Sequence, residues 1–175
     1  MIVYPNHFHF YAAPGTDVRR IIKLMQWQGQ RWFPCVDAYS RGEIPTDSLP
    51  TVSLVCHPFR WVESCFRDRI FNLPIMDGLI ETKIVYTSFY HFVMSIYDTN
   101  DDVFGRLHRQ YPSMTCWREE DLPDALLDFL HIPLITPVPR HTNRIIFDDN
   151  LGWTSYLRQL VLTKEQEICE TYDYY

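Results

Sequence analysis

Residues 51–66 combine a strand-like run, a proline turn and a helix-like run, a geometry that suits the binding of an anion. Thr51–Val55 is β-branched and apolar, and helical periodicity resumes after Pro58. His57 favours an extended or turn conformation because the residue before a proline avoids the α region, and a proline in the first helical turn costs no hydrogen bond. A helix that begins at the carboxyl end of a strand offers N–H groups to anions. The segment therefore predicts a phosphate or sulfate site and leaves the ligand open.

The rest of the chain alternates between strand-like and helix-like segments, which must position this site. Alternating or β-branched residues predict strands at 2–11, 32–39, 51–55 and 113–117. The first two helices should begin close to Thr16 and Pro58, with Thr16 and Thr163 as N-caps. This alternation is typical of an α/β fold whose central, mostly parallel sheet is covered on both faces. Apolar residues at helical spacing predict helices at 17–27, 62–70, 88–97, 121–130, 154–162 and 164–172.

Length and composition bound the class of protein. The chain has 175 residues, the size of one domain spanning 1–175, and 46% of them are hydrophobic. No run of about 18 apolar residues and no basic stretch followed by an apolar one is visible, so neither a membrane span nor a signal peptide is expected. A net charge of -6 argues against general nucleic-acid binding. Five scattered cysteines without CxxC spacing predict free thiols in a reducing, cytoplasmic compartment, and the oligomeric state stays open.

Residues 55–66 resemble the signature with which sulfotransferases hold the 3′-phosphate of their donor, V-R-[HDN]-P-x-x-R-x-x-S-x-[YF]. Cys56 stands where that family has its phosphate-binding arginine, and Trp61 stands where many members have a second one. The segment is therefore similar to the signature in shape and differs from it in charge. The residues that fit the pattern are Val55, His57, Pro58, Ser64 and Phe66.

Residues 7–18, HFHFYAAPGTDV, resemble the sulfotransferase opening F-I-H-I-P-K-T-G-G-T-S-L, a strand followed by the loop that cradles the 5′-phosphosulfate. His9, Gly15 and Thr16 match that opening. Ala12 occupies the position of the family's lysine, and Asp17 replaces a serine. The loop retains backbone N–H groups for an anion, but the lysine's charge is missing and a carboxylate has been added.

Four further stretches are similar to sulfotransferase segments and occur in the same order. They extend in this order to the end of the chain, so the sequence resembles a short member of the sulfotransferases that modify carbohydrates. The stretches are SFYHFV at 88–93 followed by LHRQYP at 107–112, WREEDL at 117–122 followed by LLDFLHIP at 126–133, RHTNR at 140–144, and YDYY at 172–175.

The resemblance implies a P-loop-like three-layer fold with a mostly parallel sheet flanked by helices. It implies transfer of a sulfuryl group from 3′-phosphoadenosine 5′-phosphosulfate (PAPS) to a hydroxyl or amine of a small molecule or carbohydrate, with no metal. The nucleotide is expected between the Pro14–Asp17 turn and Ser64, and Arg19 or Arg20 are further candidate cations. The donor-binding residues that it implies are Ala13, Pro14, Gly15, Thr16, Asp17 and Ser64, and the candidates to replace the family's missing arginine are Arg60, Arg140 and Arg144.

Sulfuryl transfer also needs a general base within hydrogen-bond reach of the acceptor. In the family the base is a histidine or glutamate, often just after the second strand. Asp37 has that position here, and His108 is the second candidate. Asp37 is also compatible with an ordinary loop residue or cap.

Two readings of the chain stay open: an active sulfotransferase with a reworked donor site, and a non-catalytic relative that binds a partner or a different ligand. Ser64, the Gly15-Thr16 turn and the basic 140–144 loop favour the enzyme, whereas Ala12 and Cys56 favour the relative.

Several residues also have plain structural readings. His57 is expected to be a hydrogen-bonded turn residue, and residues 119–121 a solvated helix start favoured by the helix dipole. His7 and His9 are expected to be ordinary strand residues and not metal ligands, because no third ligand has suitable spacing.

Overall fold

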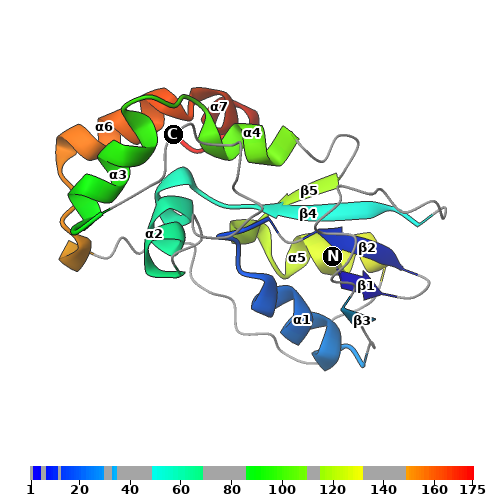
Figure 1. The fold of residues 1–175 in the computed structure, drawn as a ribbon. Helices are drawn as coiled ribbons and strands as arrows, with labels where there is room; N and C mark the ends of the chain where they lie inside the picture. The colour runs from blue at the N-terminus through cyan, green and yellow to red at the C-terminus, as the bar shows by residue number, and fades with distance from the viewer. Residues whose placement is uncertain are drawn as a thin grey trace. The chain divides into compact units, whose positions relative to one another are not determined.

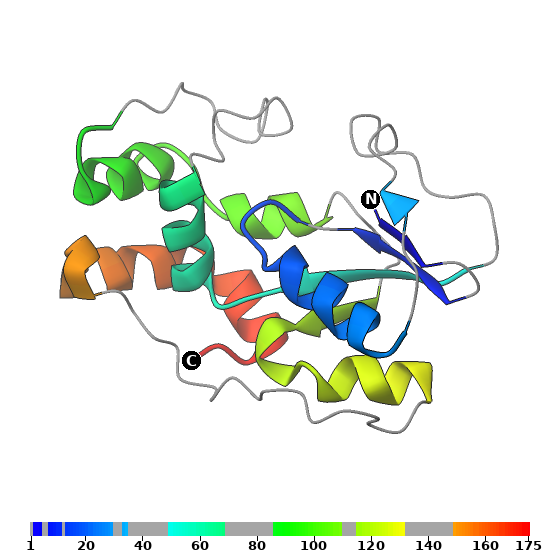
Figure 2. The same ribbon diagram turned by 90° about the horizontal axis from the view of Figure 1, so that it is seen from below.

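The computed structural model describes residues 2–4, 7–11, 13–29, 33–34, 49–68, 86–109, 115–131 and 149–175. They belong to two compact units, which we describe separately (Figures 1 and 2). Unit 1 comprises residues 1–56 and 111–144, and unit 2 comprises residues 57–110 and 145–175.

Unit 1 contains a five-stranded mixed sheet in the order β3-β1-β2-β4-β5 (Figure 1). Strands β2, β4 and β5 are parallel, with Phe10 opposite Val52 and Leu54 opposite Trp117. Strand β1 pairs antiparallel with both β2 and β3. The α/β class is therefore confirmed, with a parallel part of three strands. The strand bounds are β1 Ile2–Tyr4, β2 Phe8–Tyr11, β3 Phe33–Pro34, β4 Thr51–Val55 and β5 Thr115–Arg118.

The prediction of one continuous strand at 2–11 is wrong, because the chain reverses between β1 and β2. Ile2 lies opposite Phe10, and His7 is in a turn. Alternating residues have the same period on both sides of a reversal, so the pattern alone misses it. Pro5-Asn6 is a pair of turn-forming residue types and was the available signal. Of the strand predicted at 32–39, the described part is β3, which is antiparallel to its neighbour.

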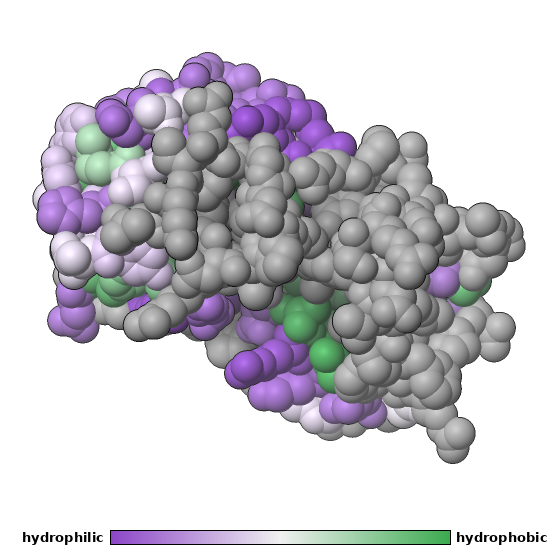
Figure 3. Space-filling view, viewed as in Figure 1, coloured by the Kyte–Doolittle hydropathy of each residue, from purple (hydrophilic) through white to green (hydrophobic). Residues whose placement is uncertain are grey.

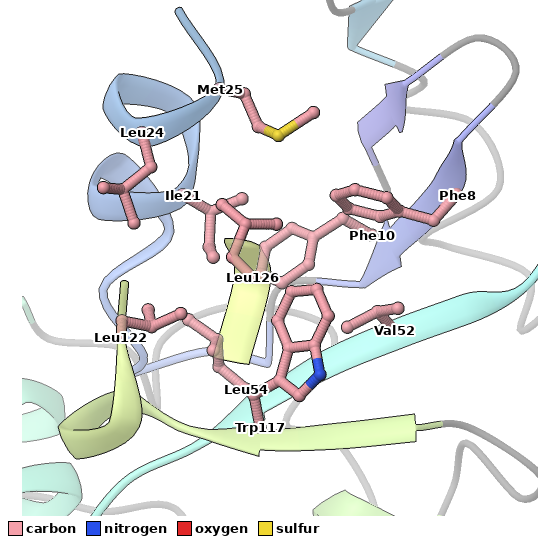
Figure 4. Packing of buried hydrophobic residues seen from close by; sticks show 10 residues of the cluster. All are labelled: Phe8, Phe10, Ile21, Leu24, Met25, Val52, Leu54, Trp117, Leu122 and Leu126. Atoms are coloured by element: carbon pink, nitrogen blue, oxygen red, sulfur yellow. The ribbon is translucent and has the colours of Figure 1, made fainter. Parts of the chain in front are cut away.

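The core of unit 1 lies on one face of its sheet. Alternate residues of β2 and β4 point to this face, where they meet α1 (Val18–Trp27) and α5 (Asp124–Leu130) (Figure 4). The Phe8 ring makes edge contacts with Trp117 at 5.8 Å and Phe129 at 5.6 Å between centroids. The two described helices of unit 1 therefore share one face of the sheet. The cluster is formed by Phe8, Phe10, Ile21, Leu24, Met25, Val52, Leu54, Trp117, Leu122 and Leu126.

Unit 2 is helical in its described part, and its helices pack through aromatic rings. The Trp61 ring stacks on Phe104 at 4.6 Å, and both side chains are fully buried. Helices α2, α3 and α6 contact one another, and α7 contacts α4 and α6. The bounds are α2 Pro58–Asp68, α3 Phe89–Tyr97, α4 Val103–Arg109, η4 Asp149–Leu151, α6 Ser155–Lys164 and α7 Gln166–Tyr172.

The predicted start of α2 at Pro58 is confirmed, but both predicted threonine caps are wrong. The Thr16 hydroxyl donates to the Ala13 carbonyl at 2.6 Å instead of accepting from the helix, and Asp17 precedes α1. Thr163 lies inside α6, and the junction with α7 is at Glu165. Threonine hydroxyls also bond to nearby carbonyls, which is why the residue type alone does not identify a cap.

The helix predicted at 121–130 is shorter in the structure. A 3₁₀ turn, η3, covers Glu119–Asp121, and α5 begins only at Asp124. Leu122 has extended backbone angles because it precedes Pro123. The proline thus separates the short turn from the helix.

No described helix is long and apolar enough to cross a membrane. The surface over α6 and α7, at the upper edge of Figure 3, is largely hydrophilic. The four cysteines in the described part of the chain (Cys56, Cys65, Cys116 and Cys169) are free thiols, as predicted.

Candidate functional site

The carboxyl ends of the parallel strands meet at one edge of the unit 1 sheet. Tyr11 ends β2 and lies opposite Ser53, whose hydroxyl donates to the Tyr11 carbonyl at 3.0 Å. Val55 ends β4 opposite Arg118, which ends β5. The loop before α1, the Cys56-His57 dipeptide and η3 therefore follow three neighbouring strands. Open sheets of this kind bind ligands at such an edge.

The loop Ala13–Asp17 is a tight turn that brings together the five donor-loop residues predicted from the sequence. Gly15 has φ of 87°, a conformation that favours glycine. The Thr16 N–H donates to the Ala13 carbonyl at 3.1 Å, and the Val18 N–H donates to the Thr16 carbonyl at 2.9 Å. Two of the backbone N–H groups at the start of α1 thus donate to carbonyl oxygens of the loop itself. Ala12 lies outside the described residues.

A third N–H group of this turn donates to a carboxylate from elsewhere in unit 1. The Asp17 N–H bonds to the Glu119 side chain, which is 0% exposed. Because the N-terminus of a helix carries partial positive charge, a buried carboxylate is stabilised there. The resemblance places the donor's 5′-phosphosulfate at this same helix end, and the protein already supplies an anion to it.

The reading of residues 119–121 as a solvated helix start is therefore wrong for Glu119. Asp121 is exposed and pairs with Arg118 at 3.2 Å, whereas Glu120 is half-buried. The bond from Asp17 to Glu119 joins positions 102 residues apart. The fold forms it by pairing β4 with β5, and no local sequence pattern indicates it.

Arg20 holds the same region together from α1. Its Nη1 donates to the Glu119 carbonyl at 2.8 Å, and its Nη2 donates to the Leu122 carbonyl at 2.6 Å. The hypothesis that Arg20 replaces a missing phosphate ligand is not supported by this geometry, because two of its donors bind backbone oxygens. Arg19 is exposed.

His57 has the role of a turn residue that was expected for it. Its Nδ1 accepts the Phe59 N–H at 3.2 Å, at the start of α2. Burial lowers the pKa of His57 to about 4, partly opposed by a hydrogen bond with the Tyr174 backbone. The ring packs against Phe59 at 4.7 Å and Tyr174 at 5.3 Å between centroids. At neutral pH the imidazole is uncharged and caps the helix through its lone pair.

Arg60 and Ser64, the two predicted donor ligands of unit 2, lie four residues apart on α2. This spacing places them on one face of the helix, and both are half-buried. Cys56, which has the position of the family's arginine, is fully buried.

His108, the second candidate base, is half-buried on α4. Its ring contacts Phe104 at 5.5 Å and Tyr172 at 5.9 Å between centroids. Asp37, Arg140 and Arg144 lie outside the described residues. Within the described ranges, no group of three or more His, Cys, Asp or Glu residues is arranged to hold a metal ion.

Sequence reasoning missed Glu165, a fully buried carboxylate between α6 and α7. It accepts the Tyr97 hydroxyl at 2.9 Å, the Phe104 N–H at 2.9 Å and the Gly105 N–H at 3.2 Å. Burial raises the pKa of Glu165 to about 7 against the lowering effect of these donors. Burial, with a smaller contribution from the Glu165 charge, also raises the pKa of the Cys169 thiol to about 11. The carboxyl therefore titrates near neutrality, and the thiol is unreactive.

No protein-family model, curated protein or solved structure matches this chain.

Proposed function

We propose that this chain is a PAPS-dependent sulfotransferase with a P-loop-like fold. The observation that carries the proposal is the arrangement of β2 and β4, which are adjacent and parallel. Each is followed at its carboxyl end by a turn and a helix, and each of these turns has the sulfotransferase-like sequence described above. Two such turns after neighbouring strands suit a donor that has phosphate groups at the 3′ and 5′ positions of its ribose.

In this proposal the phosphosulfate binds beside the Ala13–Asp17 loop, where the positive φ of Gly15 allows the close approach. Arg60 and Ser64, one turn apart on α2, are ligands of the 3′-phosphate. Arg60, or one of Arg140 and Arg144, is the cation that replaces the arginine lost at Cys56. A charge-assisted contact to phosphate contributes about 1.5–3 kcal/mol. One replacement arginine should therefore lower the Kd for the donor about tenfold to a hundredfold.

Asp37 is the proposed general base, and His108 is the second candidate. The transition state spreads negative charge over the sulfuryl oxygens, so the cations and N–H donors lower the barrier while the base removes the acceptor's proton. The proposed acceptor is a hydroxyl or amine of a small molecule or carbohydrate.

A non-catalytic relative is the second candidate, and the Glu119 carboxylate is the observation that favours it. This side chain already accepts the Asp17 N–H at the helix end where a phosphosulfate would bind. A protein that never binds the donor gains stability from such a contact.

Calorimetric titration with the desulfonated donor, adenosine 3′,5′-bisphosphate, tests the proposal. We expect saturable binding that Ser64→Ala weakens about tenfold to a hundredfold. Ser95→Ala is the matched control, because Ser95 is another half-buried helical serine of unit 2 and its hydroxyl donates to the His91 carbonyl at 2.6 Å. Absence of binding by the wild-type protein would reject the sulfotransferase.

Turnover with a panel of sugars, phenols and amines then separates the two candidates. We expect Asp37→Asn to slow transfer by about 10²–10⁴-fold and to leave the affinity for the bisphosphate nearly unchanged. Near-normal turnover of that variant would move the base role to His108, tested with His108→Asn. A wild-type protein that binds the nucleotide and sulfates nothing is the non-catalytic relative.

A further inference from the structure

If the proposed function holds, the Glu119 carboxylate and the 5′-phosphosulfate of the donor both bind at the N-terminus of α1 in unit 1. The Glu119 carboxylate is fully buried and accepts the Asp17 N–H at the start of α1. The Thr16 and Val18 N–H groups of this turn donate to carbonyl oxygens within the loop. A phosphosulfate bound to the α1 N-terminus would therefore meet a negative charge already in position.

The backbone next to Glu119 is held separately from its carboxylate. Arg20 donates to the carbonyl oxygens of Glu119 and Leu122, at 2.8 Å and 2.6 Å. Displacement of the carboxylate from Asp17 would therefore break neither of the two Arg20 bonds. A carboxylate tethered in this way competes at high effective concentration and leaves the backbone in place when it is displaced.

We propose that Glu119 is an autoinhibitory anion, which occupies the phosphosulfate position until the donor displaces it. This inference rests on the proposed sulfotransferase function and concerns the regulation of its donor site. It accounts for a loop that keeps the glycine turn of a phosphate cradle without the lysine at position 12. With the carboxylate present, the 5′-phosphate adds little to the affinity of a nucleotide.

The test compares two nucleotides that differ only at the 5′ end, adenosine 3′,5′-bisphosphate and adenosine 3′-monophosphate. Calorimetry gives the ratio of their affinities for each variant, and changes that affect both nucleotides alike cancel in this ratio. Glu119→Gln keeps an oxygen for the Asp17 N–H and removes the charge. We expect the ratio to rise at least tenfold in this variant, the effect of one charge-assisted contact.

Glu120→Gln is the matched control, because it removes the same charge from the adjacent residue of the same 3₁₀ turn. We expect its ratio to equal the wild-type ratio. Arg20→Lys is the second variant if Glu119→Gln does not fold. It keeps the positive charge and loses the forked contact that positions Glu119, so the ratio should rise by a smaller factor.

The outcomes separate this inference from the function on which it rests. If the wild-type protein binds the bisphosphate and the ratio is unchanged in Glu119→Gln, or in Arg20→Lys where that variant decides, the autoinhibitory role is wrong and the donor site stands. If the wild-type protein binds neither nucleotide, the proposed function fails and the inference fails with it. An equal rise in Glu120→Gln would also overturn it, because the effect would then be one of net charge.

Discussion

The turns that lead into α1 and α2 have similar positions along the chain, but their first N–H groups are bound by different kinds of side chain. Each follows a parallel strand, and each has its first helical N–H groups satisfied from within the chain. The α1 turn uses a buried carboxylate from the end of β5, 102 residues away. The α2 turn uses the neutral ring of His57, two residues from the N–H that it binds. The same backbone requirement is thus met by a distant charged group in one unit and by a local uncharged group in the other.

This difference changes what each helix end offers to a ligand. An anion that approaches α1 competes with Glu119, whereas the cap of α2 adds no negative charge to that helix end. Acid affects the two turns differently as well, because protonation of His57 removes the lone pair that accepts the Phe59 N–H. If the chain binds a nucleotide with two phosphate groups, we expect the α2 side to supply more of the affinity.

The largest expected effect concerns the acid sensitivity of the α2 turn. The folded-state pKa of His57, about 4, is below its ordinary value of 6.5, so its stabilising contribution is complete above pH 6.5 and is lost as the pH falls toward 4. The full loss is about 3 kcal/mol. The Glu165→Gln variant, which lacks a second titrating group, should show this loss as a fall in the free energy of urea unfolding between pH 7 and 4. A variant whose stability is flat over this range would contradict the lowered pKa.

The wild-type protein should conceal most of that loss, because Glu165 acts in the opposite direction. Its pKa is raised from 4.5 to about 7, so its contribution is complete below pH 4.5 and is lost as the pH rises through 7, again by about 3 kcal/mol. His57→Asn keeps an acceptor for the Phe59 N–H and removes the titration. We expect this variant to lose stability from pH 4.5 to 7, and the double variant to show neither slope.

Removal of the α1 cap is expected to cost somewhat less. Glu119→Ala removes the acceptor of the Asp17 N–H at a partly buried position, which should lower the free energy of unfolding by about 2 kcal/mol. Glu120→Ala, a change of the same size at the next residue, should cost under about 1 kcal/mol. Equal costs in urea unfolding at pH 7 would mean that the carboxylate contributes nothing special to the turn.

The smallest expected effect is on stability, and it comes from replacing the glycines on either side of α1. Gly15 and Gly29 lie before and after α1 with φ of 87° and 73°. Alanine at either position should cost about 1 kcal/mol, since both glycines have positive φ. In the Glu119→Gln background, only Gly15→Ala should also weaken the binding of adenosine 3′,5′-bisphosphate. Equal binding by the two variants in calorimetry would place the nucleotide away from this loop.

Patterns confined to neighbouring residues predicted the local elements well. The strand at 51–55 and the helix start at Pro58 are confirmed because β-branched residues and proline restrict the backbone directly. The role of His57 as a turn residue follows from the same rule. The errors occur where a short polar side chain has alternative partners, as at Thr16 and Thr163, or where alternation continues through a reversal, as between β1 and β2.

The sequence by itself determined the α/β class, the turn at residues 56–58 and the set of residues to examine for anion binding. Only the tertiary structure decided that Glu119 caps α1, that Arg20 binds backbone carbonyls and that Glu165 is buried with a pKa near 7. Each of these facts depends on contacts between residues 60 to 102 positions apart. A carboxylate looks the same in a sequence whether it is solvated or buried, and its chemistry is set by the donors that the fold brings to it.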